Sequence, residues 1–219
     1  MTRRTKIVIA TAFVAAVVFT VAAVLYERNS RQQAADQAAA QLDVMVRDHS
    51  PVIGPATAAV TIVEFFDPAC EACRAFYPYV KQILAAHPRE ARLVIRYTPF
   101  HREASIVGVQ VMEAARDQGR FEPVLEALLE TQPVWASHEA PATERAWEFA
   151  EAAGLDRQRA RSYIASGAVD KVLEQDVADL QAVGVRGTPT FFVNGKPLAE
   201  LNPRSLFELV KSEAELARD

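Results

Sequence analysis

The segment VEFFDPACEAC, residues 63–73, decides how this chain folds. It joins the run Val60–Phe66, which is rich in β-branched and aromatic residues, to two cysteines three positions apart. Such a run predicts a buried strand, and Asp67-Pro68 predicts its end. From Cys70 onward, apolar residues recur at the three- and four-residue spacing of a helix. The segment therefore predicts a strand that passes directly into a helix, with both cysteines in the first turn.

That position gives the two cysteines different chemistry. The first turn of a helix presents unpaired N–H groups and the positive end of the helix dipole, which stabilise a thiolate. We therefore expect the pKa of Cys70 to lie below the value of about 8.5 for a free thiol. Cys73 lies one turn further in, on the apolar face, and should stay a thiol. Cys70 would form a mixed disulfide with a substrate, and Cys73 would resolve it.

The rest of the chain predicts a second strand, a helical block, a hairpin and a final helix. After the cysteine helix, the pattern predicts a second strand and then a long, almost wholly helical block. A hairpin centred on Asn194-Gly195 and a last amphipathic helix follow. The expected ranges are strand Leu93–Tyr97, helical insertion about 101–183, strands Thr190–Val193 and Lys196–Leu198, and helix Pro203–Leu216. This is an α/β layout with a helical insertion.

The N-terminus carries a long apolar run. Residues 7–26 contain no charge, and Arg3, Arg4 and Lys6 precede them. A helix of that length rises ~30 Å, which suffices to cross the hydrocarbon core. The basic flank predicts a cytoplasmic segment at residues 1–6, a transmembrane signal-anchor at residues 7–26, and export of everything beyond.

A cleaved signal peptide is the alternative, because Thr20-Val21-Ala22 could serve as a cleavage site. The run is long for that alternative, and it ends on large residues. Both interpretations place the domain in the periplasm, or on the extracytoplasmic face of the inner membrane, where disulfide chemistry is possible.

Residues 27–48 predict a solvated helical spacer, since their apolar stripe is thin. Helix-breaking residues begin at His49-Ser50-Pro51, so the folded domain is predicted to start there and to cover residues 49–219. The spacer leaves dimer formation open.

Composition and ligand spacing argue against several other classes. A net charge of −4 without a basic patch argues against nucleic-acid binding. Zinc needs four ligands, whereas the chain has two cysteines and four scattered histidines, so no metal site is predicted. Copper transport on the two thiols lacks a supporting methionine or histidine cluster. A structural disulfide that closes so short a loop would stabilise little.

Two segments resemble the active-site motifs of the DsbA-like branch of the thioredoxin superfamily. They are residues 63–73 and GTPTFFVNG at residues 187–195, and the resemblance covers roughly Pro51–Asp219. It implies a thioredoxin-like fold with a helical insertion and a thiol:disulfide oxidoreductase activity. The redox-active disulfide Cys70–Cys73 would be the redox group, and no dissociable cofactor is expected.

The resemblance also assigns residues around the cysteines. Pro189 would be a cis proline facing the dithiol, with Thr188 and Gly187 on the substrate-binding side. An ordinary trans proline opening a strand is the alternative. Glu64 would be a buried acid that exchanges a proton with Cys73, since burial raises the pKa of a carboxyl group. The alternative is a strand residue whose side chain reaches solvent at an edge.

The dipeptide between the cysteines departs from the strong oxidases of this branch, which have a histidine there. This chain has Glu71 and Ala72 as the redox-tuning pair. A carboxylate close to Cys70 should raise the pKa of the thiol relative to a histidine, and a less stable thiolate makes a less oxidising couple.

We therefore expect an exported, membrane-anchored enzyme that exchanges disulfides with cysteines of other exported proteins, most simply forming them. A reductase or isomerase of the same fold is the alternative, and a metal-carrying or peptide-binding module is the alternative from another class. A membrane partner must reset the dithiol: a DsbB-like or VKOR-like quinone-linked enzyme for an oxidase, or a DsbD-like electron carrier for a reductase.

Overall fold

The computed structural model describes residues 3–218, and the side chains of residues 3–12, 14, 31 and 35 are outside the described part. The chain forms two compact units, Met1–Ala40 and Gln41–Asp219. Helix α1 is continuous over Arg3–Met45, so it contains the predicted anchor and most of the predicted spacer. The second unit begins earlier than residue 49 because Met45, near the end of α1, is fully buried in a core cluster.

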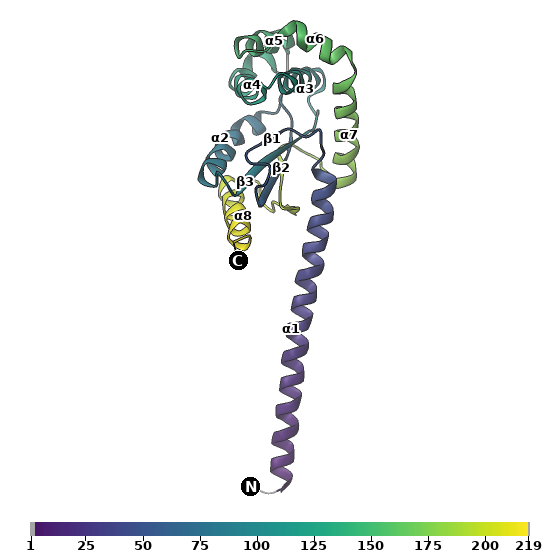
Figure 1. The fold of residues 1–219 in the computed structure, drawn as a ribbon, viewed down its shortest axis with the longest axis vertical. Coiled ribbons are helices and arrows are strands. Elements are labelled where there is room, and N and C mark those ends of the chain that lie inside the picture. Colours follow the sequence, from purple (N-terminus) through teal and green to yellow (C-terminus); the bar gives the residue numbers. More distant parts are fainter. Residues whose placement is uncertain (1–2, 219) are drawn as a thin grey trace. The chain divides into compact units, whose positions relative to one another are not determined.

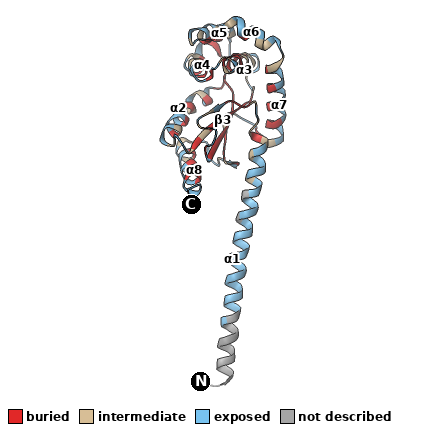
Figure 2. Cartoon of the chain, viewed as in Figure 1, coloured by how far each residue is buried: buried red, intermediate tan, exposed pale blue. Residues whose placement is uncertain are grey.

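In the first unit, the described side chains from Phe13 to Ala40 are almost all exposed (Figure 2). Within the part of the chain whose side chains are described, no helix is both long and apolar enough to span a bilayer. Residues 7–12 and 14 of the predicted anchor lie outside that part. The anchor at residues 7–26 stays a prediction.

A five-stranded sheet organises the second unit (Figure 1). The spatial order is β1-β3-β2-β4-β5, formed by Val52–Ile53, Ala91–Tyr97, Val60–Phe66, Thr190–Val193 and Lys196–Pro197. Strands β2 and β3 are parallel, and the other neighbouring pairs are antiparallel. Central strand β2 is buried along its whole length, as its β-branched and aromatic residues predict, and this burial includes the polar Thr61 and Glu64.

The two faces of the sheet support separate cores. Ile62 and Phe66 of β2 belong to the larger core, whereas Val63 and Phe65 belong to the smaller one, since successive strand side chains point to opposite faces. Helices α2, Glu71–Ala86, and α8, Pro203–Leu216, contribute to the larger core, and α7, Ala168–Val183, contributes to the smaller one. Glu64 has the strand parity of Ile62 and Phe66, which places it on the α2 side.

The predicted helical insertion is confirmed. It consists of α3, α4, α5, α6 and α7, at Arg102–Asp117, Phe121–Trp135, Thr143–Ala152, Arg157–Ala165 and Ala168–Val183. Helix α4 continues through Pro133, although a proline removes one backbone hydrogen bond, and Trp135 in its last turn is fully buried. Strand β1 was not predicted, because two residues carry no periodic pattern.

Candidate active site

Cys70 and Cys73 occupy the junction between β2 and α2. Cys70 is the N-cap residue of α2, and its backbone is extended, with φ −80° and ψ 121°. Both cysteines are free thiols, and Cys73 is fully buried while Cys70 is 6% exposed. The predicted placement of the pair at a strand-to-helix junction therefore agrees with the structure.

Hydrogen bonds stabilise the thiolate of Cys70. The hydrogen bond from the Cys73 thiol lowers the pKa of Cys70 most. Burial raises that pKa, but the net result is a pKa of about 5. The side chain of Thr188 and the backbone N–H groups of Cys73 and Ala72 lower the pKa further. The contribution from the backbone is the helix N-terminal effect that the sequence predicts.

Burial favours the neutral forms of Cys73 and Glu64. Burial is the main reason that the pKa of Cys73 is raised, and the bond to Cys70 and the charge of Glu64 add to it. Burial also raises the pKa of Glu64 well above its usual range, with the charge of Cys70 as the second cause. Glu64 is 1% exposed and its Oε1 atom has no hydrogen-bond partner. The alternative of an edge residue that reaches solvent is wrong.

The segment around residue 188 approaches Cys70 from β4. The Thr188–Pro189 peptide bond is cis. The Sγ atom of Cys70 lies 3.3 Å from the carbonyl oxygen of Thr188. Pro189 is buried, Thr188 is half-buried, and Gly187 is exposed. The structure therefore brings Thr188 to the cysteines, whereas a substrate-binding role for Gly187 stays a prediction.

The dipeptide between the cysteines faces solvent. Ala72 is exposed, and the side chain of Glu71 is 70% exposed. The Nε2 atom of His138 lies 3.9 Å from Glu71 Oε1. The His138 ring in turn packs edge-on against His101. A carboxylate so exposed acts on Cys70 mainly through solvent, which weakens its influence.

The buried carboxylate of Asp67 fixes the loop that precedes Cys70. Its Oδ1 atom accepts the N–H of Ala69 at 2.9 Å. Its Oδ2 atom accepts the N–H of Phe100 at 2.8 Å, the Ser105 hydroxyl at 2.8 Å, and both the N–H and the ring Nδ1 of His101. From the sequence, Asp67 is predicted only to end the strand, although a carboxylate three residues before Cys70 indicates a place near the redox pair.

The same loop is held from the helical insertion by Gln132. Its Nε2 atom donates to the carbonyl oxygens of Pro68, at 2.8 Å, and Cys70, at 3.0 Å. A Cβ atom on Gly108 of α3 would lie 2.6 Å from Pro68, so only glycine allows this close approach. Sequence reasoning missed both residues, because neither lies in a motif and both act over long sequence separations.

Within the described residues, no group of three or more His, Cys, Asp or Glu side chains is arranged to hold a metal ion. Cys70 and Cys73 interact with each other and with Thr188 and Glu64, an arrangement that suits thiol–disulfide exchange.

The thioredoxin family profile matches residues 46–212, which is most of the chain. The chain belongs to the thioredoxin family. This family assignment, together with the fold, confirms the predicted membership of the thioredoxin superfamily. The assignment to its DsbA-like branch stays a prediction.

Several solved structures share the fold of this thioredoxin-family chain. A thioredoxin-like oxidoreductase from Silicibacter pomeroyi is 29% identical, with a TM-score of 0.67 over 78% of this chain and 94% of the other. BdbD from Bacillus subtilis is 22% identical, with a TM-score of 0.66 over 76% of this chain and 94% of the other. The thiol-disulfide exchange protein α-DsbA2 from Wolbachia pipientis is 18% identical, with a TM-score of 0.66 over 84% and 97%.

Curated relatives include larger proteins. A Na⁺/H⁺ antiporter NhaA from Herminiimonas arsenicoxydans is 33% identical over 151 residues, which is 69% of this chain and 23% of the antiporter. NhaA 1 from Salinispora arenicola is 38% identical over 165 residues, which is 71% of this chain and 24% of that protein. The chain thus spans about a quarter of the length of the curated relatives it matches.

The lowered pKa of Cys70 generates a measurable pH dependence. Titration of the reduced protein, followed by thiolate absorbance at 240 nm, should give a midpoint near pH 5 that is lost in Cys70→Ser. Because the folded pKa lies below the unfolded value of 9.0, the thiolate stabilises the folded reduced protein fully above about pH 9. That stabilisation should decline as the pH falls and vanish below about pH 5. A midpoint above pH 8 would contradict the assignment.

Proposed function

We propose that the protein is an exported thiol–disulfide oxidoreductase that exchanges disulfides between its Cys70–Cys73 pair and cysteines of other exported proteins. The observation that carries the proposal is the asymmetry of the pair. The pKa of Cys70 falls to about 5, whereas Cys73 one turn away is fully buried with a raised pKa. At neutral pH one sulfur is then a thiolate and the other a thiol, as thiol–disulfide exchange requires.

The proposed reaction starts from the oxidised pair. A substrate thiolate attacks Cys70 Sγ, the Cys70–Cys73 bond breaks, and Cys73 leaves with the electron pair and takes up a proton. A second substrate thiolate then attacks the substrate sulfur of the mixed disulfide, and Cys70 leaves as a thiolate. The substrate loses two electrons and forms one disulfide, and the protein gains two electrons as a dithiol.

Glu64 is the proposed proton carrier for Cys73. It lies on the α2 side of β2, burial raises its pKa and so favours its neutral form, and one of its oxygens has no partner. In the exchange, Glu64 would give a proton to Cys73 as that sulfur leaves and would take it back when Cys73 attacks. Neither group has solvent beside it to do this, because Glu64 and Cys73 are 1% and 0% exposed.

Disulfide formation is the proposed direction. A thiolate stabilised at Cys70 favours the reduced form of the pair, which makes the oxidised form a better oxidant. The exposure of Glu71 supports this direction, because its charge is screened by solvent. A reductase would need a less stable thiolate. An oxidase must be reset by a quinone-linked membrane partner of the DsbB or VKOR type, which we propose as the electron acceptor.

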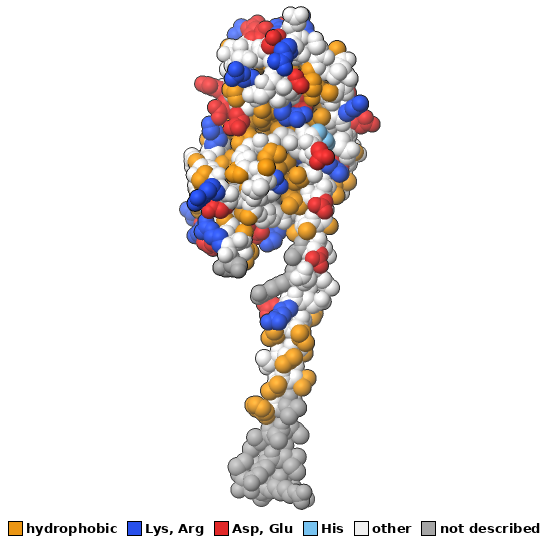
Figure 3. All heavy atoms as spheres, in the orientation of Figure 1, with side chains coloured by type: hydrophobic (Ala, Val, Ile, Leu, Met, Phe, Trp, Pro, Cys, Tyr) orange, Lys and Arg blue, Asp and Glu red, His pale blue; other side chains and the backbone are white. Residues whose placement is uncertain are grey.

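We also propose that the N-terminal helix anchors the domain at the outer face of the inner membrane. From Ala15 to Tyr26, no charged residue interrupts α1, and large apolar side chains such as Phe19 and Leu25 are 76% and 59% exposed. Hydrophobic side chains gather along this part of α1 (Figure 3). Exposed apolar surface of this extent favours burial in an apolar phase.

The equilibrium redox potential of the full-length protein tests the direction. Measured against glutathione buffers, the Cys70–Cys73 couple should lie between roughly −120 and −180 mV, the range of oxidising exported enzymes. A value near roughly −270 mV, as in thioredoxin, would make the protein a reductant and reject the oxidase proposal.

Glu64→Gln tests the proton carrier while keeping the shape of the side chain. Formation of the mixed disulfide from the oxidised pair, in which Cys73 leaves and takes up a proton, should slow by about 10²-fold, since general acid–base catalysis contributes that much. The second step, in which another substrate thiolate attacks the mixed disulfide and Cys70 leaves, should change far less, and quenched-flow alkylation resolves the two steps. An equal slowing of both steps would speak against a role confined to Cys73.

Alkaline extraction of membranes tests the anchor. The full-length chain, expressed in a Gram-negative host, should stay in the membrane pellet, and a variant with Val17→Lys and Val21→Lys should leave it. Release of the unaltered chain, shortened at its N-terminus, would instead support the cleaved signal peptide.

A further inference from the structure

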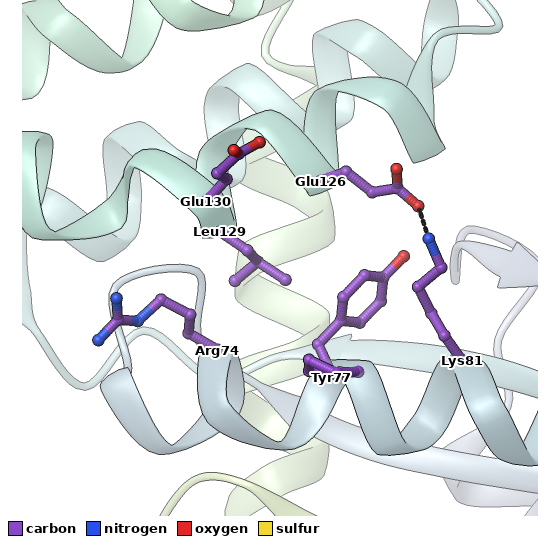
Figure 4. A pocket seen from close by; sticks show the side chains of 7 residues that line it. Arg74, Tyr77, Lys81, Glu126, Leu129 and Glu130 are labelled. Atoms are coloured by element: carbon purple, nitrogen blue, oxygen red, sulfur yellow. Dashed lines mark hydrogen bonds and ion pairs between the residues drawn. The ribbon is translucent and has the colours of Figure 1, made fainter.

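A hollow of about 580 Å³ lies between α2 and α4, apart from the cysteine site. Tyr77 and Pro78 of α2 and Leu129 of α4 form its apolar lining. Figure 4 shows Glu126 of α4 paired with Lys81 beside Tyr77, and Glu130 further along α4, next to Leu129. The hollow therefore combines an apolar floor with a charged rim.

This hollow lies on the face of α2 that begins at the nucleophile. Arg74, Tyr77, Pro78 and Lys81 follow Cys70 by four, seven, eight and eleven positions, which is the spacing of one helix face. A second hollow, of about 320 Å³, shares Arg74 and extends to Glu71. We call the two hollows together the α2–α4 groove. It runs from the first turn of α2 along the helix.

The groove carries an excess of negative charge. Four carboxylates line it, Glu71, Glu126, Glu130 and Glu139, against the two cations Arg74 and Lys81. One of those cations is already used, because the Lys81 ammonium forms an ion pair with Glu126. Glu130 has no hydrogen-bond or ion-pair partner among the described residues.

Lys81 also demonstrates how a cation is held in the groove. Its Nζ atom lies 5.9 Å from the centre of the Tyr77 ring, within range of a cation–π interaction, while it pairs with Glu126. Glu130 lies one helical turn beyond Glu126, next to Leu129 of the floor. A second cationic side chain could lay its methylene stem on that floor and place its head against Glu130.

We propose that the α2–α4 groove binds a lysine or arginine of the partner protein that exchanges disulfides with Cys70. The inference rests on the proposed function and adds a preference among substrates. Tyr77 lies seven residues beyond Cys70, ~11 Å along the helix axis. An extended chain spans about 10 Å in three residues, so the basic residue should lie about three positions from the reacting cysteine.

Single-cysteine peptides test this proposal directly. Three peptides differ only in Lys, Gln or Glu at the third position from the cysteine, and a second set of three places the change on the other side. The oxidised full-length protein reacts with each reduced peptide, and acid quenching with mass spectrometry gives the rate constant. The lysine peptide of one set should react about threefold faster than its glutamine counterpart, which is the size of an exposed ion pair. This preference should fall toward one in 0.5 M NaCl.

Variants on the two helices should move that preference in opposite directions. Glu130→Gln should bring the Lys-to-Gln rate ratio close to one. Lys81→Gln should raise the ratio severalfold, because it frees Glu126 for the peptide and removes a competing cation. Glu174 is an exposed carboxylate on α7, away from the groove. The control variant Glu174→Gln changes the net charge by the same amount and should leave the ratio unchanged. Dividing each rate by that of the glutamine peptide cancels any effect on the redox pair.

The outcomes separate the two proposals. A wild-type ratio near one in both peptide sets, or an equal fall in Glu130→Gln and Glu174→Gln, overturns the groove proposal while leaving disulfide exchange intact. A preference for the glutamate peptide also overturns it, and would indicate that Arg74 dominates the groove. Failure to react with any peptide, including the neutral one, would instead reject the proposed function.

Discussion

The carboxylate of Asp67 is buried where β2 gives way to α2, and a buried carboxylate must be surrounded by donors. Five groups supply them, from Ala69, Phe100, His101 and Ser105, so the loop before the cysteines is tied to the start of the helical insertion. An unpaired charge at this depth would cost several kcal/mol. The position of Cys70 depends on this constraint. Cys70 is the N-cap of α2 and lies 3.3 Å from the Thr188 carbonyl oxygen only because the loop before it is held in place.

The two sulfurs are distinguished by burial and by hydrogen bonding rather than by their place in the motif alone. Cys70 receives a hydrogen bond from Cys73 and has the first N–H groups of α2 close by, so its charged form is favoured. Cys73 is fully buried above Glu64, so its neutral form is favoured. One bond thus acts in opposite senses on its two ends, and the difference in pKa between the sulfurs exceeds what either environment would give by itself.

The opposite face of the sheet is fixed by a second set of buried charges. Arg96 of β3 is fully buried and donates to Asp176 and Asp179 of α7, and to the carbonyl oxygens of Val44 and Met45 at the end of α1. Burial alone would raise the pKa of Asp179, but the bonds from Arg47 and Arg96 lower it. The last turn of α1 is therefore part of the second compact unit, which begins at Gln41 rather than at the predicted residue 49.

The sequence alone determined the elements whose signals are local. The run Val60–Phe66 and the final helix Pro203–Leu216 lie within the ranges that composition, periodicity and an N-terminal proline predict, and the cysteines meet the helix start as expected. Only the tertiary structure decided what lies around the thiols. Asp67 bonds to residues more than thirty positions away, Gln132 bonds to Cys70 across sixty-two positions, and Glu130 of α4 lines the same hollow as Tyr77 of α2. No periodic pattern records such contacts, because they arise from how α3 and α4 pack against the β2–α2 junction, and packing depends on shape across the whole domain.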